Sequence, residues 1–186
     1  MRPLERSQLL DYQTYAEERD DHRSRIMRAK NARRVHVGPH LTFLFENHDT
    51  IWYQIQEMMR VEHIVKEADI AHELGTYNEL LGGPGELGCT LLIEIESPEE
   101  RAVWLKKWLP LPHHLYAELE DGTRVPASFD PRQVGEERLS SVQYLKFQTG
   151  GRVPVAIGSD FEELKAHTLL TEAQRKALSV DLSQDN

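Results

Sequence analysis

The sequence predicts an α+β fold: an antiparallel sheet of about five to six strands, a long N-terminal helix, and further helices packed on the sheet. Two observations support this class. Short segments in which apolar and polar residues alternate recur through the middle of the chain, as they do in half-buried strands. Longer segments with helical spacing precede and interrupt them, and the second half has the turn signals of a meander.

One domain is the default for a chain of 186 residues, which is long enough to bury a substantial core. We divide it into a long helix over residues 1–32, an α+β core over 33–158, and C-terminal helices with a tail over 159–186. The apolar fraction of 39% and the charged fraction of 28% are typical of a soluble globular protein.

The N-terminal segment, from residue 4 to about 31, is expected to form one long helix that starts near Ser7. Its apolar residues are few, so only a narrow stripe can hold it against other elements. Such a helix either lies across the surface or packs on a second subunit. A homodimer is therefore one of the alternatives.

Two strands are expected next, over 35–37 and 41–46, on either side of the Gly38–Pro39 break. Residues 47–50 have the composition of a turn, and Asp49 or Thr50 is expected to cap a helix over 51–66. Another helix, over 68–81, should end at the glycines that follow it.

The second half predicts mostly strands. Ser97 and Pro98 have the pattern of a capped helix start, and Asp121–Gly122 predicts a tight hairpin. Ser159 and Thr171 resemble two more helix starts, and the tail over 179–186 is expected to fray. The expected strands cover 89–96, 115–120, 125–129, 141–148 and 153–157.

Composition excludes several classes of protein. The net charge of −9 argues against general nucleic-acid binding, and no apolar run approaches the roughly 18 residues of a membrane helix. The N-terminus lacks the apolar stretch of a signal peptide, and the single Cys89 cannot form an intrachain disulfide. We therefore expect a cytoplasmic protein with no membrane partner.

A basic stretch between His22 and Arg34 contains no acidic residue. Its arginines include Arg23, Arg25 and Arg28, which follow an acidic segment in the same predicted helix. They either belong to a solvated helix with acidic partners of its own, or form a basic face for an acidic partner protein, a nucleotide or an RNA.

Nine histidines make metal binding worth testing, but the expected motifs are missing. The chain has no His-Glu-x-x-His and no Glu-x-x-His, which are the helix signatures of zinc proteases and di-iron bundles. We expect no bound metal, with His48 and Glu57 as weak candidates. Cys89 is expected in the core, and the glycine-rich residues 82–88 lack the ending of a phosphate loop.

The segment from Arg33 to His63 is the predicted site, because long polar side chains stand among tightly spaced apolar ones. Burying such groups without partners costs roughly 1–3 kcal/mol or more, so they form either an internal network or a ligand site. If they converge, guanidinium groups, carboxylates and amides could bind an anionic molecule or a partner. The candidates are Arg33, Arg34, Glu46, Asn47, Gln54, Gln56, Glu57, Arg60 and Glu79.

The sequence RRVHVGPHLTFLFENHDTIWYQIQEMMRVE, followed by TYNELL, CTLLIEIE and LSSVQYLKF, resembles an uncharacterised bacterial family catalogued as domain of unknown function 3501. The resemblance covers nearly the whole chain and implies no established activity. It does imply a setting, because genes of this family are often found beside those for rubrerythrin-like proteins and iron–sulphur oxidoreductases. That setting is peroxide defence, oxidative stress or electron transfer.

Two hypotheses follow. With one cysteine the chain cannot hold a cluster through four thiolates, so it would be an accessory protein that docks onto such a partner through its basic stretch. Alternatively, it is a small enzyme or sensor, with Glu57 as base or metal ligand and Arg60 or Arg34 as anion clamp. Which cofactor, if any, the protein uses is unknown from the sequence, and whether it is an enzyme stays open.

Overall fold

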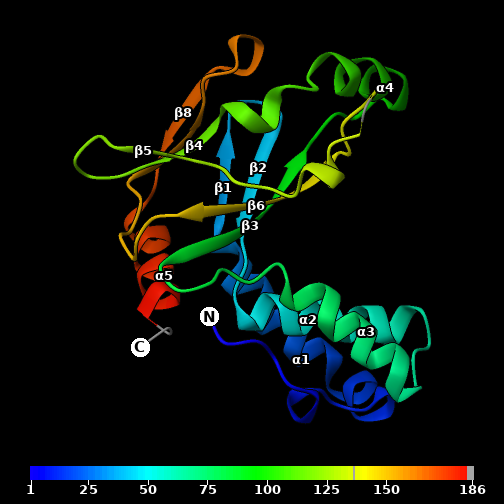
Figure 1. The fold of residues 1–186 in the computed structure, drawn as a ribbon. Coiled ribbons are helices and arrows are strands. Elements are labelled where there is room, and N and C mark those ends of the chain that lie inside the picture. The colour runs from blue at the N-terminus through cyan, green and yellow to red at the C-terminus, as the bar shows by residue number, and fades with distance from the viewer. Residues whose placement is uncertain (136, 184–186) are drawn as a thin grey trace.

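The structure, a computed structural model, describes residues 1–135 and 137–183 and confirms the antiparallel α+β class (Figure 1). Its strands form two four-stranded antiparallel sheets instead of one sheet of about five to six strands. The strand orders are β1-β2-β3-β6 and β5-β4-β7-β8. No helix in the described ranges has both the length and the apolar character that a membrane span requires.

The first sheet contains the central motif of the sequence. Residue pairing across it is regular: Val35 lies opposite Phe43, and Phe43 opposite Leu91. Because side chains alternate between faces, these three residues point to one side, which we call the inner face. The strands are β1 (Arg34–Val37), β2 (Leu41–Phe45), β3 (Glu86–Ile93) and β6 (Val142–Gln148).

The second sheet covers the inner face of the first. The two sheets meet at both edges: Ser128 and Lys146 exchange backbone hydrogen bonds beside β6, and the Thr168 hydroxyl donates to the carbonyl of His36 in β1. The larger hydrophobic core lies between the sheets. The strands are β4 (Leu115–Glu118), β5 (Arg124–Pro126), β7 (Ala156–Ser159) and β8 (Ala166–Leu169).

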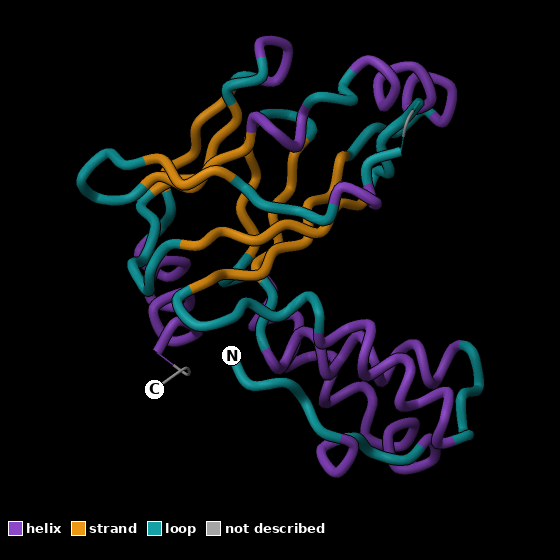
Figure 2. The backbone as a smooth tube through the Cα atoms, in the orientation of Figure 1, coloured by secondary structure: helices purple, strands orange, loops and turns teal. Residues whose placement is uncertain are grey.

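Helices α1 to α3 pack mainly on one another, beside the sheets, as Figure 2 shows. They share a second hydrophobic core around Tyr15, Ile26, Ile55 and Ile70, and we call them the helical cluster. Their bounds are α1 (Tyr12–Asn31), α2 (His48–Val61) and α3 (Glu67–Asn78), with the short 3-10 helix η1 (Arg6–Gln8) beside α3. The other helices, which border the sheets, are α4 (Pro98–Lys107), η2 (Leu111–His114), η3 (Pro131–Gln133), η4 (Glu162–Leu164) and α5 (Glu172–Ser183).

The starts of the first two predicted helices differ from the sequence prediction. The first helix begins at Tyr12 and not near Ser7, because the Asp11 carboxylate accepts hydrogen bonds from the backbone N–H groups of Gln13 and Thr14. Helix α2 begins at His48, earlier than predicted. Its N-cap is Asn47 and not Asp49 or Thr50.

The C-terminal region differs most. The start predicted at Ser159 is only the short helix η4, and strand β8 follows it. The start at Thr171 is confirmed, since Thr171 and Gln174 form a reciprocal cap ahead of α5. Residues 179–183, which were expected to fray, are helical, and Asp181 and Leu182 are buried; residues 184–186 lie outside the described ranges.

Candidate functional site

The predicted site residues do not converge on a single pocket. The structure divides most of them among three hydrogen-bonded networks, centred on Glu57, on Asp181 and on Glu46. Asp181 was not among the candidates. Each of the three networks has a partner outside the segment from Arg33 to His63.

Glu57 joins α1 to α2, and both of its carboxylate oxygens already accept hydrogen bonds. Its Oε1 accepts from the Tyr15 hydroxyl at 2.8 Å and from Arg19 Nε at 2.8 Å, and its Oε2 accepts from Arg19 Nη2 at 2.9 Å. Arg60 Nη2 adds a bond at 3.2 Å. Hydrogen bonding to Arg19, above all, lowers the pKa of Glu57 to about 2, although desolvation opposes it. Such a carboxylate is a poor base and favours the internal-network alternative.

The two glutamines of α2 differ. The Gln54 side chain makes no hydrogen bond within the ranges that the structure describes. Gln56 is 1% exposed, and its side-chain oxygen has no hydrogen-bond partner among the described residues. Neither glutamine reaches the Glu57–Arg60 pair, so the expected amide contribution at this end of the helix is not seen.

The second network is a buried ion pair between Arg33 and Asp181. Arg33 Nε and Nη2 donate to the two carboxylate oxygens at 2.7 and 2.8 Å, and the Asp181 side chain is fully buried. Arg33 Nη1 also donates to the carbonyl of Ala29, and Asn47 Nδ2 donates to Asp181 at 3.3 Å. Arg33 and Asn47 are therefore used to join elements and have little left for a ligand.

The third network surrounds Glu46, at the end of β2. Its carboxylate accepts from the Thr50 hydroxyl at 2.5 Å and from the Thr90 hydroxyl at 2.6 Å. Neither donor carries a charge. The negative charge of Glu46 acts to raise the pKa of three neighbouring groups: the Lys30 ammonium, the buried thiol of Cys89 and the phenol of Tyr144.

Glu46 lies at one end of the outer face of the first sheet, opposite to the inner face. The strand register places side chains on this outer face in rows across the four strands. One row contains Arg34, Leu44, Thr90 and Tyr144, and the next contains His36, Thr42, Leu92 and Val142. Tyr144 is 44% exposed, so part of this face is open to solvent.

Lys30 and Arg34 are the cations of this region that lack a carboxylate partner. Neither side chain makes an ion pair or hydrogen bond in the described portion of the chain, although both are half-buried. Burial is the main cause that lowers the pKa of Lys30; the charge of Arg34 lowers it further and that of Glu46 opposes both. The Lys30 ammonium lies 5.3 Å from the ring centre of Tyr53.

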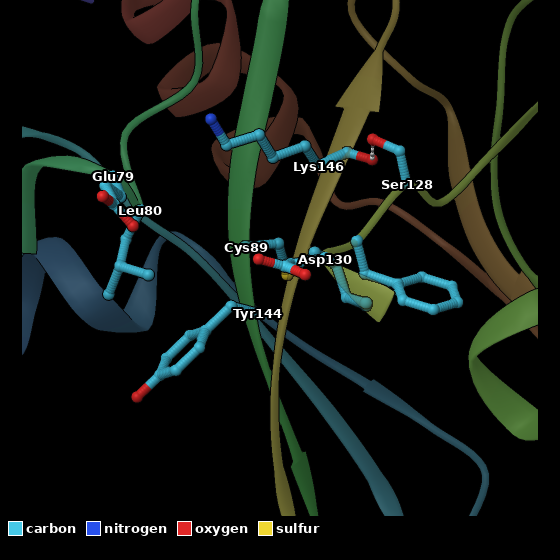
Figure 3. A pocket seen from close by; sticks show the side chains of 9 residues that line it. Glu79, Leu80, Cys89, Ser128, Asp130, Tyr144 and Lys146 are labelled. Atoms are coloured by element: carbon cyan, nitrogen blue, oxygen red, sulfur yellow. Dashed lines mark hydrogen bonds between the residues drawn. The ribbon is translucent and has the colours of Figure 1, made fainter. Parts of the chain in front are cut away.

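A small cavity of about 340 Å³ borders the outer face at strand β6. Figure 3 shows Leu80 and Tyr144 on one side of that strand and Ser128 on the other. Glu79, the last of the predicted site residues, belongs to this cavity, away from the Glu57 network. The full lining is Glu79, Leu80, Cys89, Ser128, Phe129, Asp130, Tyr144, Leu145 and Lys146.

The remaining candidates are placed as follows. His48 contacts the backbone carbonyl of Arg2, and no group of three or more histidine, cysteine or acidic side chains is arranged for a metal within the described ranges. Cys89 is buried in the core, and burial raises the pKa of its thiol. Of the basic stretch, Arg23 and Arg28 are exposed on α1, and Arg25 lies 3.7 Å from Asp49.

Comparison with known proteins places the chain in a family. Residues 3–182 match the model of a protein family of unknown function, DUF3501. The chain belongs to this family. No functionally characterised curated protein matches it.

A solved structure has the same fold. It is a crystal structure from Burkholderia pseudomallei, titled a novel protein of unknown function, and it is 29% identical in sequence. The match has a TM-score of 0.89 and covers 97% of this chain and 100% of that one. The likeness extends over the helical cluster and both sheets but supplies no activity for either protein.

Several residues of these networks were not among the candidates: Tyr15, Arg19, Thr50, Thr90 and Asp181, together with Lys30 beside Glu46. Asp181 had a signal, because Leu178, Asp181 and Leu182 share one face at helical spacing. Lys30 was grouped with the exposed basic stretch. Thr90 alternates with buried strand residues, which placed it on the outer face but gave no partner.

We expect Glu57→Gln to remove a pH-dependent part of the stability. The pKa of Glu57 is about 2 in the folded protein, against 4.5 for a free side chain, so its contribution is present above pH 4.5 and lost as the pH falls towards 2. The wild type should lose on the order of 2 kcal/mol relative to Glu57→Gln over that range. Urea unfolding at several pH values measures this, with Glu62→Gln, at the exposed C-cap of the same helix, as control. Parallel curves for wild type and Glu57→Gln would contradict the assignment.

We expect Asp181→Asn to lower the free energy of unfolding by about 3–5 kcal/mol, because it leaves the Arg33 charge buried without its partner. Replacing both partners together, as Arg33→Met with Asp181→Leu, should restore most of the loss. Ser179→Ala, at an exposed position of the same helix, should stay within about 0.5 kcal/mol of wild type. Denaturant unfolding checks all three. A loss for Asp181→Asn no larger than for Ser179→Ala would show that the pair does not support the fold.

Proposed function

We propose that this protein binds a small anionic molecule on the outer face of the first sheet, with Arg34 and Lys30 as the groups that hold the anion. The carrying observation is that these two half-buried cations have no anionic partner at hydrogen-bond distance among the described residues. The neighbouring arginines Arg19, Arg33 and Arg60 are all paired with carboxylates. A carboxylate or phosphate would supply the missing partner.

The surroundings support such a ligand. Leu44 and the ring of Tyr144 flank Thr90 in the same row as Arg34, which offers an apolar floor beside a cationic edge. Glu46 accepts hydrogen bonds from two hydroxyl groups, and its negative charge opposes the lowering of the Lys30 pKa by burial without forming an ion pair with the ammonium. The ligand class that fits is an anion with an apolar or aromatic body.

Arg34→Ala should weaken the binding of such an anion by about 10- to 100-fold, which corresponds to the loss of a charge-assisted pair of hydrogen bonds. Inorganic phosphate, citrate and benzoate are the probes, measured by calorimetry and by native mass spectrometry of the protein prepared without chelator. Arg23→Ala is the matched control, because Arg23 is an exposed arginine of α1 that lies away from the sheet.

Equal affinities for Arg34→Ala and Arg23→Ala would overturn the proposal, as would the absence of binding to the wild type by all three probes. Circular dichroism confirms that each variant is folded. Among the described residues the Arg34 side chain makes no hydrogen bond. Its backbone pairs with Leu44 and accepts from Gln174 Nε2, and the substitution does not alter these backbone contacts.

A second candidate function is the accessory role, docked onto a rubrerythrin-like protein or an iron–sulphur oxidoreductase in oxidative stress or electron transfer. The family resemblance motivates it, and the exposure of Arg23 and Arg28 on α1 favours α1 as the docking surface. Neither arginine has a carboxylate partner within the described ranges. A cytoplasmic location and a homodimer stay predictions within this proposal.

If the docking proposal is correct, the triple variant Arg23→Glu, Arg25→Glu and Arg28→Glu should bind an acidic partner at least tenfold more weakly, mostly through a slower association rate. Surface plasmon resonance with the purified neighbouring proteins measures it at low and physiological salt. The control is Arg175→Glu with Lys176→Glu, exposed cations on α5. Unchanged affinity in the triple variant excludes α1 as the docking surface.

A further inference from the structure

A hydrogen-bonded chain of three side chains crosses the outer face beside the proposed anion site. His36 Nδ1 lies 2.8 Å from the Thr42 hydroxyl, and that hydroxyl donates to Glu94 Oε2 at 2.9 Å. Thr42 is 1% exposed, whereas His36 and Glu94 are both exposed. A buried hydroxyl thus joins a surface imidazole to a surface carboxylate.

The direction of these bonds fixes the form of the imidazole. A threonine hydroxyl has one proton, and a carboxylate only accepts, so the proton of Thr42 goes to Glu94. The same oxygen must then accept from Nδ1–H of His36. Neutral His36 therefore has its lone pair on Nε2, and no described residue bonds to that nitrogen.

The position of His36 makes this lone pair relevant to the anion site. His36 is two residues from Arg34 on the same strand and on the same face, which puts their Cα atoms about 7 Å apart. Leu92 and Val142 share its row, and both line an open cavity of about 780 Å³ together with Glu94 and His40. The cavity lies at the Leu92 and Val142 end of this row, and a molecule held at Arg34 reaches His36 by extending about 7 Å along β1.

We propose that the outer face is a catalytic site in which His36 accepts a proton from the anion bound at Arg34 and Lys30. This inference rests on the proposed anion-binding function and adds a reaction to it, the transfer of a proton from the bound anion to His36. The C–H or O–H bond of the substrate breaks, its electron pair stays on the substrate, and the proton goes to Nε2 of His36. Nδ1–H keeps its bond to Thr42, through which Glu94 stabilises the imidazolium that forms.

Thr42 and Glu94 are positioning residues in this scheme, because they act through His36. The substrate class is an anion that carries an acidic proton within a few bonds of its carboxylate or phosphate. The reaction class is proton abstraction next to an electron-withdrawing group, which needs no co-reactant.

Deuterium exchange tests the proposal with two probes of this class, pyruvate and dihydroxyacetone phosphate. Proton NMR in D₂O follows the loss of the acidic C–H signal, with wild type, His36→Gln, Thr42→Val and Arg34→Ala. Histidine 72 is exposed on α3, away from the outer face, so His72→Gln is the matched control. Nitrogen-15 NMR of the free protein reports the tautomer of His36 without any ligand.

We expect wild type and His72→Gln to exchange at least one probe about 100-fold faster than His36→Gln. Thr42→Val should slow the exchange at saturation and lose the fixed Nδ1–H tautomer, while Arg34→Ala should chiefly raise the half-saturating concentration. If the Thr42 hydroxyl had only a structural role, Thr42→Val would change neither the tautomer of His36 nor the exchange rate.

Two results would overturn the proposal: equal exchange by wild type and His36→Gln, or a neutral wild-type His36 whose proton is on Nε2 instead of Nδ1. If anion binding still depends on Arg34 in that case, the binding function stands and only the catalytic role fails. If His36→Gln abolishes exchange while Arg34→Ala has no effect on binding or half-saturation, the catalytic role is supported and the anion site has been misplaced.

Discussion

The buried ion pair between Arg33 and Asp181 is the contact on which the arrangement of the molecule depends. Arg33 stands in the short link between α1 and β1, and Asn47, which also bonds to Asp181, stands in the link between β2 and α2. Both links join the helical cluster to the first sheet, and α5 holds them from the far end of the chain. A buried charge without its partner is costly, so the bonds at Asp181 stabilise the arrangement in which these three segments lie together. The position of the helices relative to the outer face follows from this contact.

The same contact explains why the adjacent residues Arg33 and Arg34 differ in their charge partners. Arg33 precedes the strand and turns towards α5, whereas Arg34 is the first residue of β1 and points to the outer face. Asp181 neutralises the first, and nothing described neutralises the second. A similar division holds among the carboxylates: Glu57 is saturated by two arginines and a phenol, while Glu46 accepts only from hydroxyl groups. Among the half-buried cations described above, Lys30 and Arg34 are the two without a carboxylate partner in the described ranges, and both lie beside the first sheet.

Local patterns predicted most elements but not how their side chains pair. The alternation in strands β1, β2 and β6, the hairpin at Asp121–Gly122 and the cap at Ser97 are set by neighbours in sequence, and each is confirmed. The partners of Arg33 and Glu46 lie 148 and 44 residues away, and no periodicity encodes such distances. Strand β8 was missed because AHTL is short and half-exposed, and pairing with β7 decides its conformation. Arg33, Glu46, Asn47 and Gln56 of the candidate segment are buried, but the sequence could not distinguish the charges that are paired from those that are not.

The buried hydroxyl of Thr42 shows how this difference bears on function. All five residues of β2 are buried, so a valine at position 42 would fill the same space without needing partners. A threonine there must be hydrogen-bonded, and its partners are an imidazole and a carboxylate that both reach solvent. Packing alone does not require that choice, because burial of an unpaired hydroxyl would cost roughly 1–3 kcal/mol. What the hydroxyl does provide is a defined orientation and tautomer for His36, at the row next to Arg34. The polar groups at His36 and Glu94 thus reach solvent, whereas those of the ion pair at Asp181 are buried and connect α5 to the segments beside the first sheet.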